Sequence, residues 1–139
     1  MPFTVADGNA LLSQVFAPWV QDLSLAVTNI TDSGAVLRLP FSESLCREGQ
    51  ILCGQSLMAL ADTAAVLAVC AASGTYRDMA TVDQSIHLLK PVSGQDVLAS
   101  ADVTRLGRTM AFISVTMSGA EDEKVVAMAQ LAYAVQPAG

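Results

Sequence analysis

The hydrophobic residues of this chain follow two patterns, one continuous apolar run near the middle and several shorter runs on either side of it. Residues 56–72 are Ala, Leu, Val, Met and Cys almost without interruption, apart from Asp62 and Thr63. A helix that is apolar on every side is buried on every side. Gly54 precedes the run and Ser73-Gly74 follows it, and glycine often ends a helix in the left-handed conformation. The pattern therefore predicts one long, buried helix that begins at about Gly54 and stops at Ser73-Gly74.

Six other segments have the composition and spacing of β-strands, namely residues 23–31, 35–40, 79–89, 96–106, 109–118 and 124–135. The first two are joined by Asp32-Ser33-Gly34, a sequence typical of a hairpin turn. Residues 109–118 alternate polar and apolar side chains, as a half-buried strand does. Residues 124–135 are nearly all apolar, which predicts a strand that is covered on both faces.

The remaining segments are a short N-terminal helix and a polar loop. Asp7 is a plausible cap for a helix through Leu11 and Phe16, which Pro18 ends. Residues 42–49 are polar and loop-like. The economical way to bury the central apolar helix is to wrap an antiparallel sheet around it. We therefore expect an α+β, hotdog-like fold as a single domain of residues 1–139, with residues 1–20 as an N-terminal helix and lead-in.

The composition predicts association with a second copy. Of the 139 residues, 53% are hydrophobic and only 14% are charged, so a monomer would struggle to cover its apolar surface. A membrane span needs about 20 uninterrupted apolar residues, and the central run is shorter and contains Asp62. No basic segment precedes an apolar one at the N-terminus, so we expect no signal peptide. The net charge of −6 argues against a nucleic-acid partner.

The cysteines and the single histidine do not form a recognisable metal site. Cys46, Cys53 and Cys70 cannot all pair with one another, and His87 is distant from them in sequence. Free thiols in a reducing cytoplasm are therefore the simplest interpretation, with no zinc site. A Ser-His-Asp triad would have to use His87, which lies on a predicted strand and for which a structural or exposed position is the simpler interpretation. The sequence contains no nucleophile elbow, zinc-protease motif, phosphate-binding loop or dinucleotide-binding glycine motif.

Asp62 is the residue that suggests chemistry. A carboxylate inside an apolar helix is costly unless it is paired or used. It follows Gly54 by eight residues, about two helical turns at about 1.5 Å per residue. A small ligand at the helix start could therefore meet both the free N–H groups there and the carboxylate. The alternative is a structural carboxylate that a neighbouring Thr or Arg satisfies.

Three stretches resemble the hotdog-fold acyl-CoA thioesterases of the phenylacetic-acid-degradation (PaaI-like) type. Residues 53–62, CGQSLMALAD, are similar to the start of the catalytic helix in that family. Residues 85–91, SIHLLKP, are similar to its strand that ends in a basic residue and Pro. Residues 103–112, VTRLGRTMAF, are similar to its next hairpin, with basic residues flanking a glycine. The resemblance covers roughly residues 42–135.

The resemblance implies hydrolysis of an acyl-CoA thioester in a site between two protomers of a homodimer or homotetramer. The N–H of Gly54, or of its neighbour, would bind the thioester oxygen, and Asp62 would attack the carbonyl or activate a water. Thr81 would help to hold that water. Coenzyme A would be part of the substrate rather than a cofactor. The residues that would contact it are Asp83, Arg105, Gly107, Arg108 and Thr109, although Arg105 and Arg108 could equally be solvated charges at strand ends.

The chain departs from the family pattern at three positions near the substrate. Cys53 replaces a histidine, Gln55 replaces a second glycine, and Arg47 replaces a neutral amide. Cys53 is most simply a small buried residue. Arg47 could face solvent, pair with Asp62, or bind a carboxylate of a dicarboxylic acyl group. These departures leave a second hypothesis, a non-catalytic acyl-CoA-binding or regulatory protein; a hydratase is disfavoured because its Asp-and-His pair is not visible.

Overall fold

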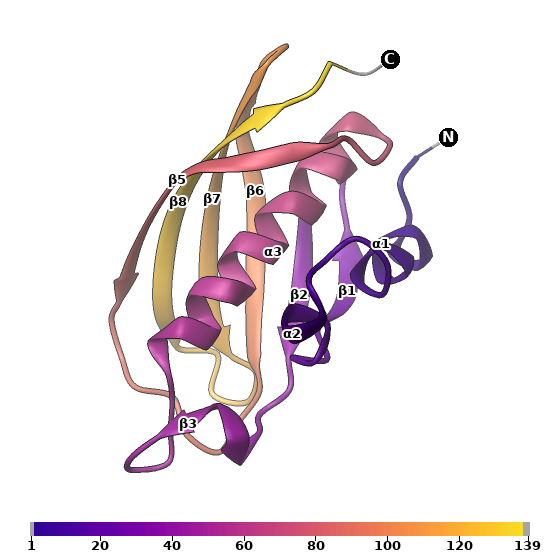
Figure 1. Cartoon of the computed structure of the whole chain (residues 1–139). Helices are drawn as coiled ribbons and strands as arrows, with labels where there is room; N and C mark the ends of the chain where they lie inside the picture. Colours follow the sequence, from indigo (N-terminus) through magenta and orange to yellow (C-terminus); the bar gives the residue numbers. More distant parts are fainter. Residues whose placement is uncertain (1, 138–139) are drawn as a thin grey trace.

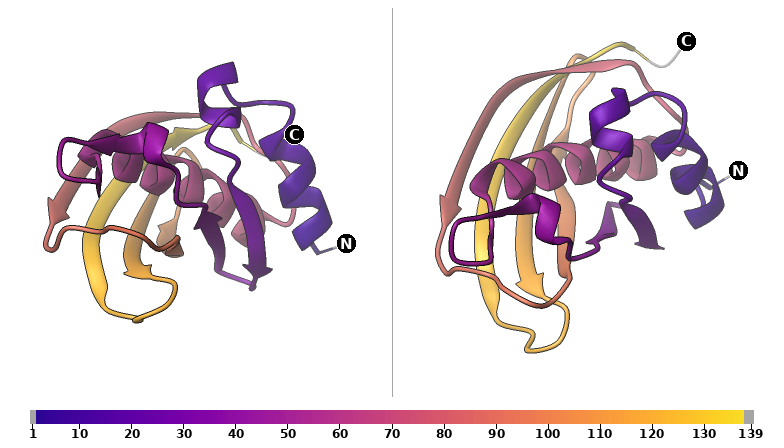
Figure 2. Two further views of the ribbon diagram at one scale, coloured as in Figure 1. Left: turned by 90° about the horizontal axis from the view of Figure 1, so that it is seen from below. Right: turned by 60° about the horizontal axis from the view of Figure 1, so that its bottom comes forward.

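The computed structural model describes residues 2–137, in which one long helix lies across the concave face of a curved antiparallel sheet (Figures 1 and 2). The sheet has six strands in the order β1-β2-β6-β7-β8-β5. Its strands are β1 (Ala26–Ile30), β2 (Gly34–Leu39), β5 (Met79–Leu88), β6 (Val97–Leu106), β7 (Met110–Gly119) and β8 (Val125–Val135). The predicted hotdog fold is confirmed.

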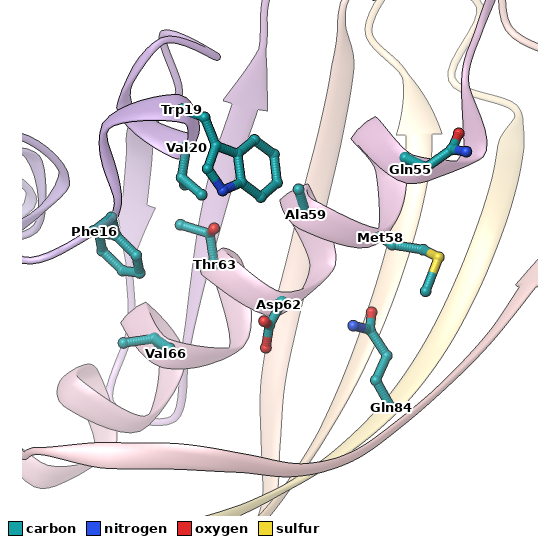
Figure 3. Close-up of a pocket in the computed structure, with 10 residues that line it drawn as sticks. All are labelled: Phe16, Trp19, Val20, Gln55, Met58, Ala59, Asp62, Thr63, Val66 and Gln84. Carbon is teal, nitrogen blue, oxygen red and sulfur yellow. The ribbon is translucent and has the colours of Figure 1, made fainter.

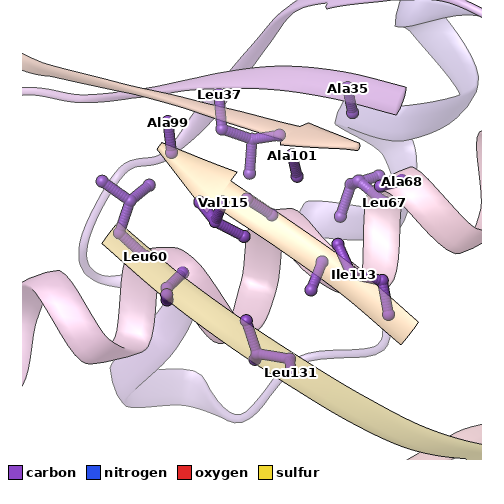
Figure 4. Packing of buried hydrophobic residues seen from close by; sticks show 14 of the residues in the cluster. Ala35, Leu37, Leu60, Leu67, Ala68, Ala99, Ala101, Ile113, Val115 and Leu131 are labelled. Atoms are coloured by element: carbon purple, nitrogen blue, oxygen red, sulfur yellow. The ribbon is translucent and has the colours of Figure 1, made fainter. Parts of the chain in front are cut away.

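The central helix α3 (Gly54–Ser73) forms the core with the inner face of the sheet. Gly74 ends it with a φ of 76°, in the left-handed conformation predicted from the sequence. Leu60, Leu67 and Ala68 are fully buried against the inward-facing side chains of the sheet (Figure 4). By length and composition alone α3 could cross a membrane, but 72% of that window is buried inside the chain, as in a core helix.

The prediction that α3 is buried on every side is wrong for one stripe of the helix. Gln55 and Met58 are exposed, and Ala59, Asp62 and Val66 are only partly buried. These residues are three or four positions apart, so they lie on one face of the helix. The sheet covers the other faces, and this stripe is left open toward the N-terminal lead-in.

The two faces of the sheet differ, which corrects the prediction for the last strand. Inward-facing Leu131, Tyr133 and Val135 of β8 are buried. The outward-facing Gln130 is exposed, and Met128 is 49% exposed. Strand β8 is therefore covered on one face only, because no helix or second sheet packs on the outer face within the described part of the chain.

The N-terminal lead-in begins earlier than predicted and has two helices. The cap of α1 (Val5–Leu12) is Thr4, and Asp7 occupies the third helical position, where its carboxylate accepts from the Thr4 N–H. This reciprocal pair is a capping box. Pro18 does not end a helix but begins the next one, α2 (Pro18–Gln21), because proline suits the first helical position.

The polar loop before α3 also contains regular structure. A 3-10 turn, η1 (Glu43–Leu45), is followed by a small hairpin of β3 (Cys46–Arg47) and β4 (Ile51–Leu52). The turn of this hairpin uses positive φ at Gly49 (90°) and Gln50 (62°). Composition alone did not reveal this hairpin, since its strands are only two residues long.

Candidate active site

Asp62 is held by two hydroxyl groups from the sheet. Its Oδ1 accepts a hydrogen bond of 2.9 Å from the Thr81 hydroxyl and another from the Tyr133 hydroxyl. The Tyr133 hydroxyl also lies 2.6 Å from the carbonyl oxygen of Asp62. Among the described residues no donor contacts Oδ2. One carboxylate oxygen is therefore fixed, and the other is available.

Tyr133 is a residue of the candidate site that could not be predicted from the resemblance. Its side chain is fully buried, and burial, together with the adjacent negative charge of Asp62, raises the pKa of its phenol above the ordinary value. The hydroxyl therefore stays protonated and remains a donor to the carboxylate. The signal was present in the sequence, because the alternation of residues 125–135 places this one polar-tipped side chain on the inward face.

The open stripe of α3 forms the floor of a cavity of about 340 Å³ (Figure 3). Phe16, Trp19 and Val20 from the lead-in form an apolar wall, with Val66 and Ala59 from the helix. The polar lining residues are Gln55, Asp62, Thr63 and Gln84. Trp19 is 60% exposed, so the lead-in covers the cavity only partly. The carboxylate thus opens into a largely apolar space.

The start of α3 presents N–H groups without partners. Its cap residue, Cys53, makes no side-chain hydrogen bond to the helix start. The Ser56 N–H bonds the Cys53 carbonyl oxygen at 3.2 Å, and within residues 2–137 no acceptor contacts the N–H of Gly54 or Gln55. Free N–H groups and the helix dipole favour a negatively charged oxygen at this position.

Gly54 and Asp62 open into different pockets of the same chain. Gly54 lines a second cavity of about 250 Å³ together with Arg47, Leu88 and Lys90. A Cβ atom at Gly54 would lie 2.8 Å from Leu88 Cδ1, so glycine permits this close approach. The oxyanion donor and the carboxylate that the sequence analysis combined are therefore not brought together within one chain.

Arg47 faces solvent on strand β3, the first of its three alternatives. Its guanidinium donates to the Glu48 carbonyl oxygen at 3.0 Å. Within one chain, over residues 2–137, it makes no ion pair with Asp62 and does not line the Asp62 cavity. The alternative of pairing with Asp62 is therefore not realised within a single chain, because the small β3–β4 hairpin holds Arg47 beside the helix start instead.

The sequence of residues 49–126 matches the model of the thioesterase superfamily. The chain belongs to this superfamily. A protein of Thermoplasma acidophilum that is named as a proposed esterase is 24% identical over 106 residues, 75% of this chain and 80% of its own length.

Solved structures show the same thioesterase fold. A thioesterase of Haemophilus influenzae superposes with a TM-score of 0.86 at 22% identity, over 99% of this chain and 93% of its own. A hypothetical thioesterase of Streptococcus pneumoniae, solved with coenzyme A, gives a TM-score of 0.74 at 19% identity, over 81% of this chain and 86% of its own. At these identities the likeness extends to the fold alone.

In this thioesterase-superfamily chain, two of the predicted coenzyme A contacts share one row on the outer face of the sheet. Asp83 pairs with Ala132, Ala132 with Phe112, and Phe112 with Arg105. Asp83 and Arg105 are exposed, and the Phe112 ring between them is 42% exposed. Phe112 was not predicted as a site residue, because its aromatic ring belongs to a pattern that predicts only a strand.

The other three predicted contacts form the β6–β7 turn. Gly107 donates its N–H to the Met110 carbonyl at 2.7 Å, and the Arg108 carbonyl accepts from the buried guanidinium of Arg77 at 3.2 Å. Thr109 accepts the Val135 N–H through its carbonyl. The side chains of Arg108 and Thr109 are exposed. Neither lines the Asp62 cavity.

The remaining candidates lie apart from the carboxylate. Cys53 is half-buried rather than buried, and it lines a small pocket beside Trp19 and Gln55. His87 is exposed and pairs with Met128 on the outer face, so it cannot serve a triad with Asp62 inside this chain. Among residues 2–137, no group of three His, Cys, Asp or Glu side chains is arranged to hold a metal ion.

Proposed function

We propose that this protein hydrolyses an acyl-CoA thioester, with Asp62 as general base or nucleophile. The observation that carries the proposal is the carboxylate itself: Oδ1 is fixed by Thr81 and Tyr133, Oδ2 has no donor among residues 2–137, and Asp62 lines a largely apolar cavity. A general base has to be oriented and accessible, and this one is both. The cavity is of a size to take an acyl group.

The proposed reaction needs no cofactor. Water attacks the thioester carbon while Asp62 takes its proton, and the carbonyl oxygen becomes negatively charged. The free N–H groups at the start of α3, in one of the two chains, stabilise that charge. Collapse of the intermediate breaks the C–S bond, and the proton passes from Asp62 to the leaving thiolate. The products are a carboxylic acid and coenzyme A.

We propose further that the oxyanion donor comes from a second copy of the chain. Gly54 and Asp62 line separate pockets in one chain, which supports a site that two chains complete. Strand β5 is at an open edge of the sheet beside both pockets, so pairing of two β5 edges would join the sheets of a homodimer. A homotetramer would be a dimer of such dimers.

The nucleotide part of coenzyme A is proposed to lie on the outer face of the sheet, near Arg105 and the β6–β7 turn. The guanidinium groups of Arg105 and Arg108 suit phosphate recognition. The Streptococcus relative solved with coenzyme A makes this class of ligand a reasonable choice. Together with the three sequence stretches, these features favour the PaaI-like type of thioesterase.

The experiment that tests this function is a thiol-release screen over straight-chain, aromatic and dicarboxylic acyl-CoAs, with binding measured in parallel. We expect turnover of at least one acyl group. Binding of acyl-CoA without any thiol release would instead favour the non-catalytic acyl-CoA-binding or regulatory protein. Neither binding nor release would contradict both functions.

A further inference from the structure

Gln84 is a polar side chain of the Asp62 cavity that the proposed mechanism has not used. Its side-chain carbonyl oxygen is buried, and no donor within the described residues contacts it. A buried carbonyl without a partner costs free energy, and in native proteins such a group is normally satisfied. The same residue lines the cavity into which Asp62 opens. Among the described residues, the oxygen is therefore an acceptor without a partner in the wall of that cavity.

An irregularity in β5 brings Gln84 to the same side of the sheet as Thr81. In a regular strand, residues three apart face opposite sides. Here the pairing with β8 shifts at Val82, so that Thr81 pairs with Tyr133 and Gln84 pairs with Leu131, both of them inward-facing. Such bulges are frequent beside active sites, where they redirect a side chain.

Gln84 lies at one end of the cavity, on the same side of Asp62 as Gln55 and Met58. In Figure 3 the Gln84 amide extends from β5 toward α3, beside Met58 and on the Gln55 side of Asp62. Phe16 and Val66 lie on the other side of the carboxylate. An acyl group bound among Phe16 and Val66 would therefore leave the Gln84 amide on the opposite side of the carboxylate, beside the proposed reacting carbon.

We propose that Gln84 and Asp62 together bind the attacking water. This inference rests on the proposed thioesterase function. A water molecule has two protons, and the site offers two acceptors without donors, Asp62 Oδ2 and the Gln84 carbonyl oxygen. When the water donates one hydrogen bond to each acceptor, a lone pair of its oxygen is directed away from both, toward the thioester carbon.

The step balances with these two residues. The water oxygen forms a bond to the thioester carbon. The water proton that is hydrogen-bonded to Asp62 Oδ2 moves onto that carboxylate oxygen. The other water proton, which is hydrogen-bonded to the Gln84 carbonyl oxygen, stays on the water oxygen, and this O–H group becomes the hydroxyl of the product acid. The C–S bond then breaks, its electron pair leaves with sulfur, and Asp62 returns the proton to the thiolate. Asp62 therefore acts as a base rather than as a nucleophile.

The test compares Gln84→Met with the wild-type chain and with Gln130→Met. Methionine keeps the length of the side chain and removes the acceptor. Gln130 lies on the outer face of the same sheet, so it is a matched control for the same exchange. Steady-state kinetics are measured with butanoyl-CoA and benzoyl-CoA, and the assembly state of each variant by sedimentation. If Gln84→Met does not fold, Gln84→Leu is used in its place.

We expect Gln84→Met to lower kcat by about 10- to 100-fold, as for the loss of one hydrogen bond at a desolvated site. The loss should be equal for both acyl groups, with KM changed less than about threefold, because water is common to both reactions. Gln130→Met should retain wild-type kcat.

Three results would overturn the inference while leaving the thioesterase function intact. The first is an unchanged kcat. The second is a loss of kcat for one acyl group only, which would place the Gln84 amide against the acyl chain. The third is a change of assembly state, which would place the amide between chains. If the wild-type chain releases no thiol from any acyl-CoA, the proposed function itself fails, and the bound water fails with it.

Discussion

The Asp62 cavity and the pocket at the start of α3 are about two helical turns apart. They differ in whether one chain alone supplies hydrogen-bond partners for their polar groups. Around Asp62, Thr81 and Tyr133 fix the carboxylate from two neighbouring strands. At the helix start, the N–H groups of Gly54 and Gln55 have no acceptor within residues 2–137. The first region is prepared to hold a base, and the second is prepared to receive a negative charge.

The difference indicates what each region contributes to a shared reaction. A fixed carboxylate needs its partners before the substrate arrives, because its orientation decides its use. Free N–H groups must remain unpaired until charge develops on the substrate. Since one chain directs these two regions into separate pockets, the proposed mechanism requires a second chain to bring one of each together.

The largest effect is expected at the carboxylate. Asp62→Asn should lower kcat for the best acyl-CoA by about 10²- to 10⁴-fold, because it removes the base and changes the volume very little. Binding of a non-hydrolysed acyl-CoA analogue should be nearly unchanged, as measured by calorimetry. A variant that hydrolyses its best substrate at the wild-type rate would contradict the role of Asp62.

The next effect is expected at the helix start. Gly54→Pro removes one N–H at the first helical position, where proline is tolerated, and should lower kcat by about 10²-fold. Gly54→Ala keeps the N–H and is the matched control. Its new Cβ would approach only Leu88 Cδ1, the end of an exposed side chain that can turn away.

Mixed dimers of these variants test whether two chains share one site. When Gly54→Pro and Asp62→Asn chains are produced together, half of the sites in each mixed dimer would contain both intact residues. With random pairing about half of the dimers are mixed, so activity should recover to about a quarter of wild type overall and to about half in isolated mixed dimers, from two inactive parents. No recovery in mixed dimers isolated by two different tags would show that each chain uses its own Gly54 and Asp62.

The sequence predicted most of the fold because its signals were strong and local. The apolar run and Gly74 defined α3, and alternation defined the long strands. The start of α1 was misjudged because Thr4 and Asp7 both resemble helix caps, and only the reciprocal hydrogen bonds distinguish them. Strand β8 was misjudged because alanines suit a covered face and an open one equally well.

The site was predicted only in part, because its geometry depends on pairing between distant strands. Asp62 and Thr81 could be identified from the resemblance, and the structure joins them. Gln84 could not, since the bulge at Val82 decides which way it faces and leaves no local mark in the sequence. For Arg47 the sequence left three alternatives open, and within one chain the β3–β4 hairpin, which was not predicted, holds its side chain toward solvent.

A smaller effect is expected from Tyr133→Phe, which removes one of the two donors to Asp62 Oδ1. We expect kcat to fall about 10-fold and KM to change little, since the carboxylate is then less well oriented. Steady-state kinetics with the best acyl-CoA measure both constants. An unchanged kcat would show that Thr81 alone is enough to hold Asp62.

The same variant has a predicted effect on stability at high pH. The pKa of Tyr133 is raised above 10, the ordinary value, by burial first and by the charge of Asp62 second. The stability that depends on the neutral phenol is therefore present below pH 10 and is lost as the pH rises above it, because the unfolded chain ionises first. In urea titrations, Tyr133→Phe should lose less stability than wild type between pH 9 and pH 11.

The smallest effect is expected at Arg47, which lies in the second of the two regions, the pocket at the start of α3. Its guanidinium is exposed and, among residues 2–137 of one chain, bonds only the Glu48 carbonyl, so Arg47→Asn should leave the melting temperature nearly unchanged. An exposed cation contributes at most about 1 kcal/mol to binding an anion, which limits the rise in KM for acyl-CoA to about fivefold. Steady-state kinetics at low and high salt measure this rise, which salt should diminish. A higher kcat of Arg47→Asn for neutral acyl groups would instead mean that Arg47 pairs with the Asp62 of the other chain. Loss of a preference for dicarboxylic acyl groups would mean that Arg47 binds the distal carboxylate of such an acyl group.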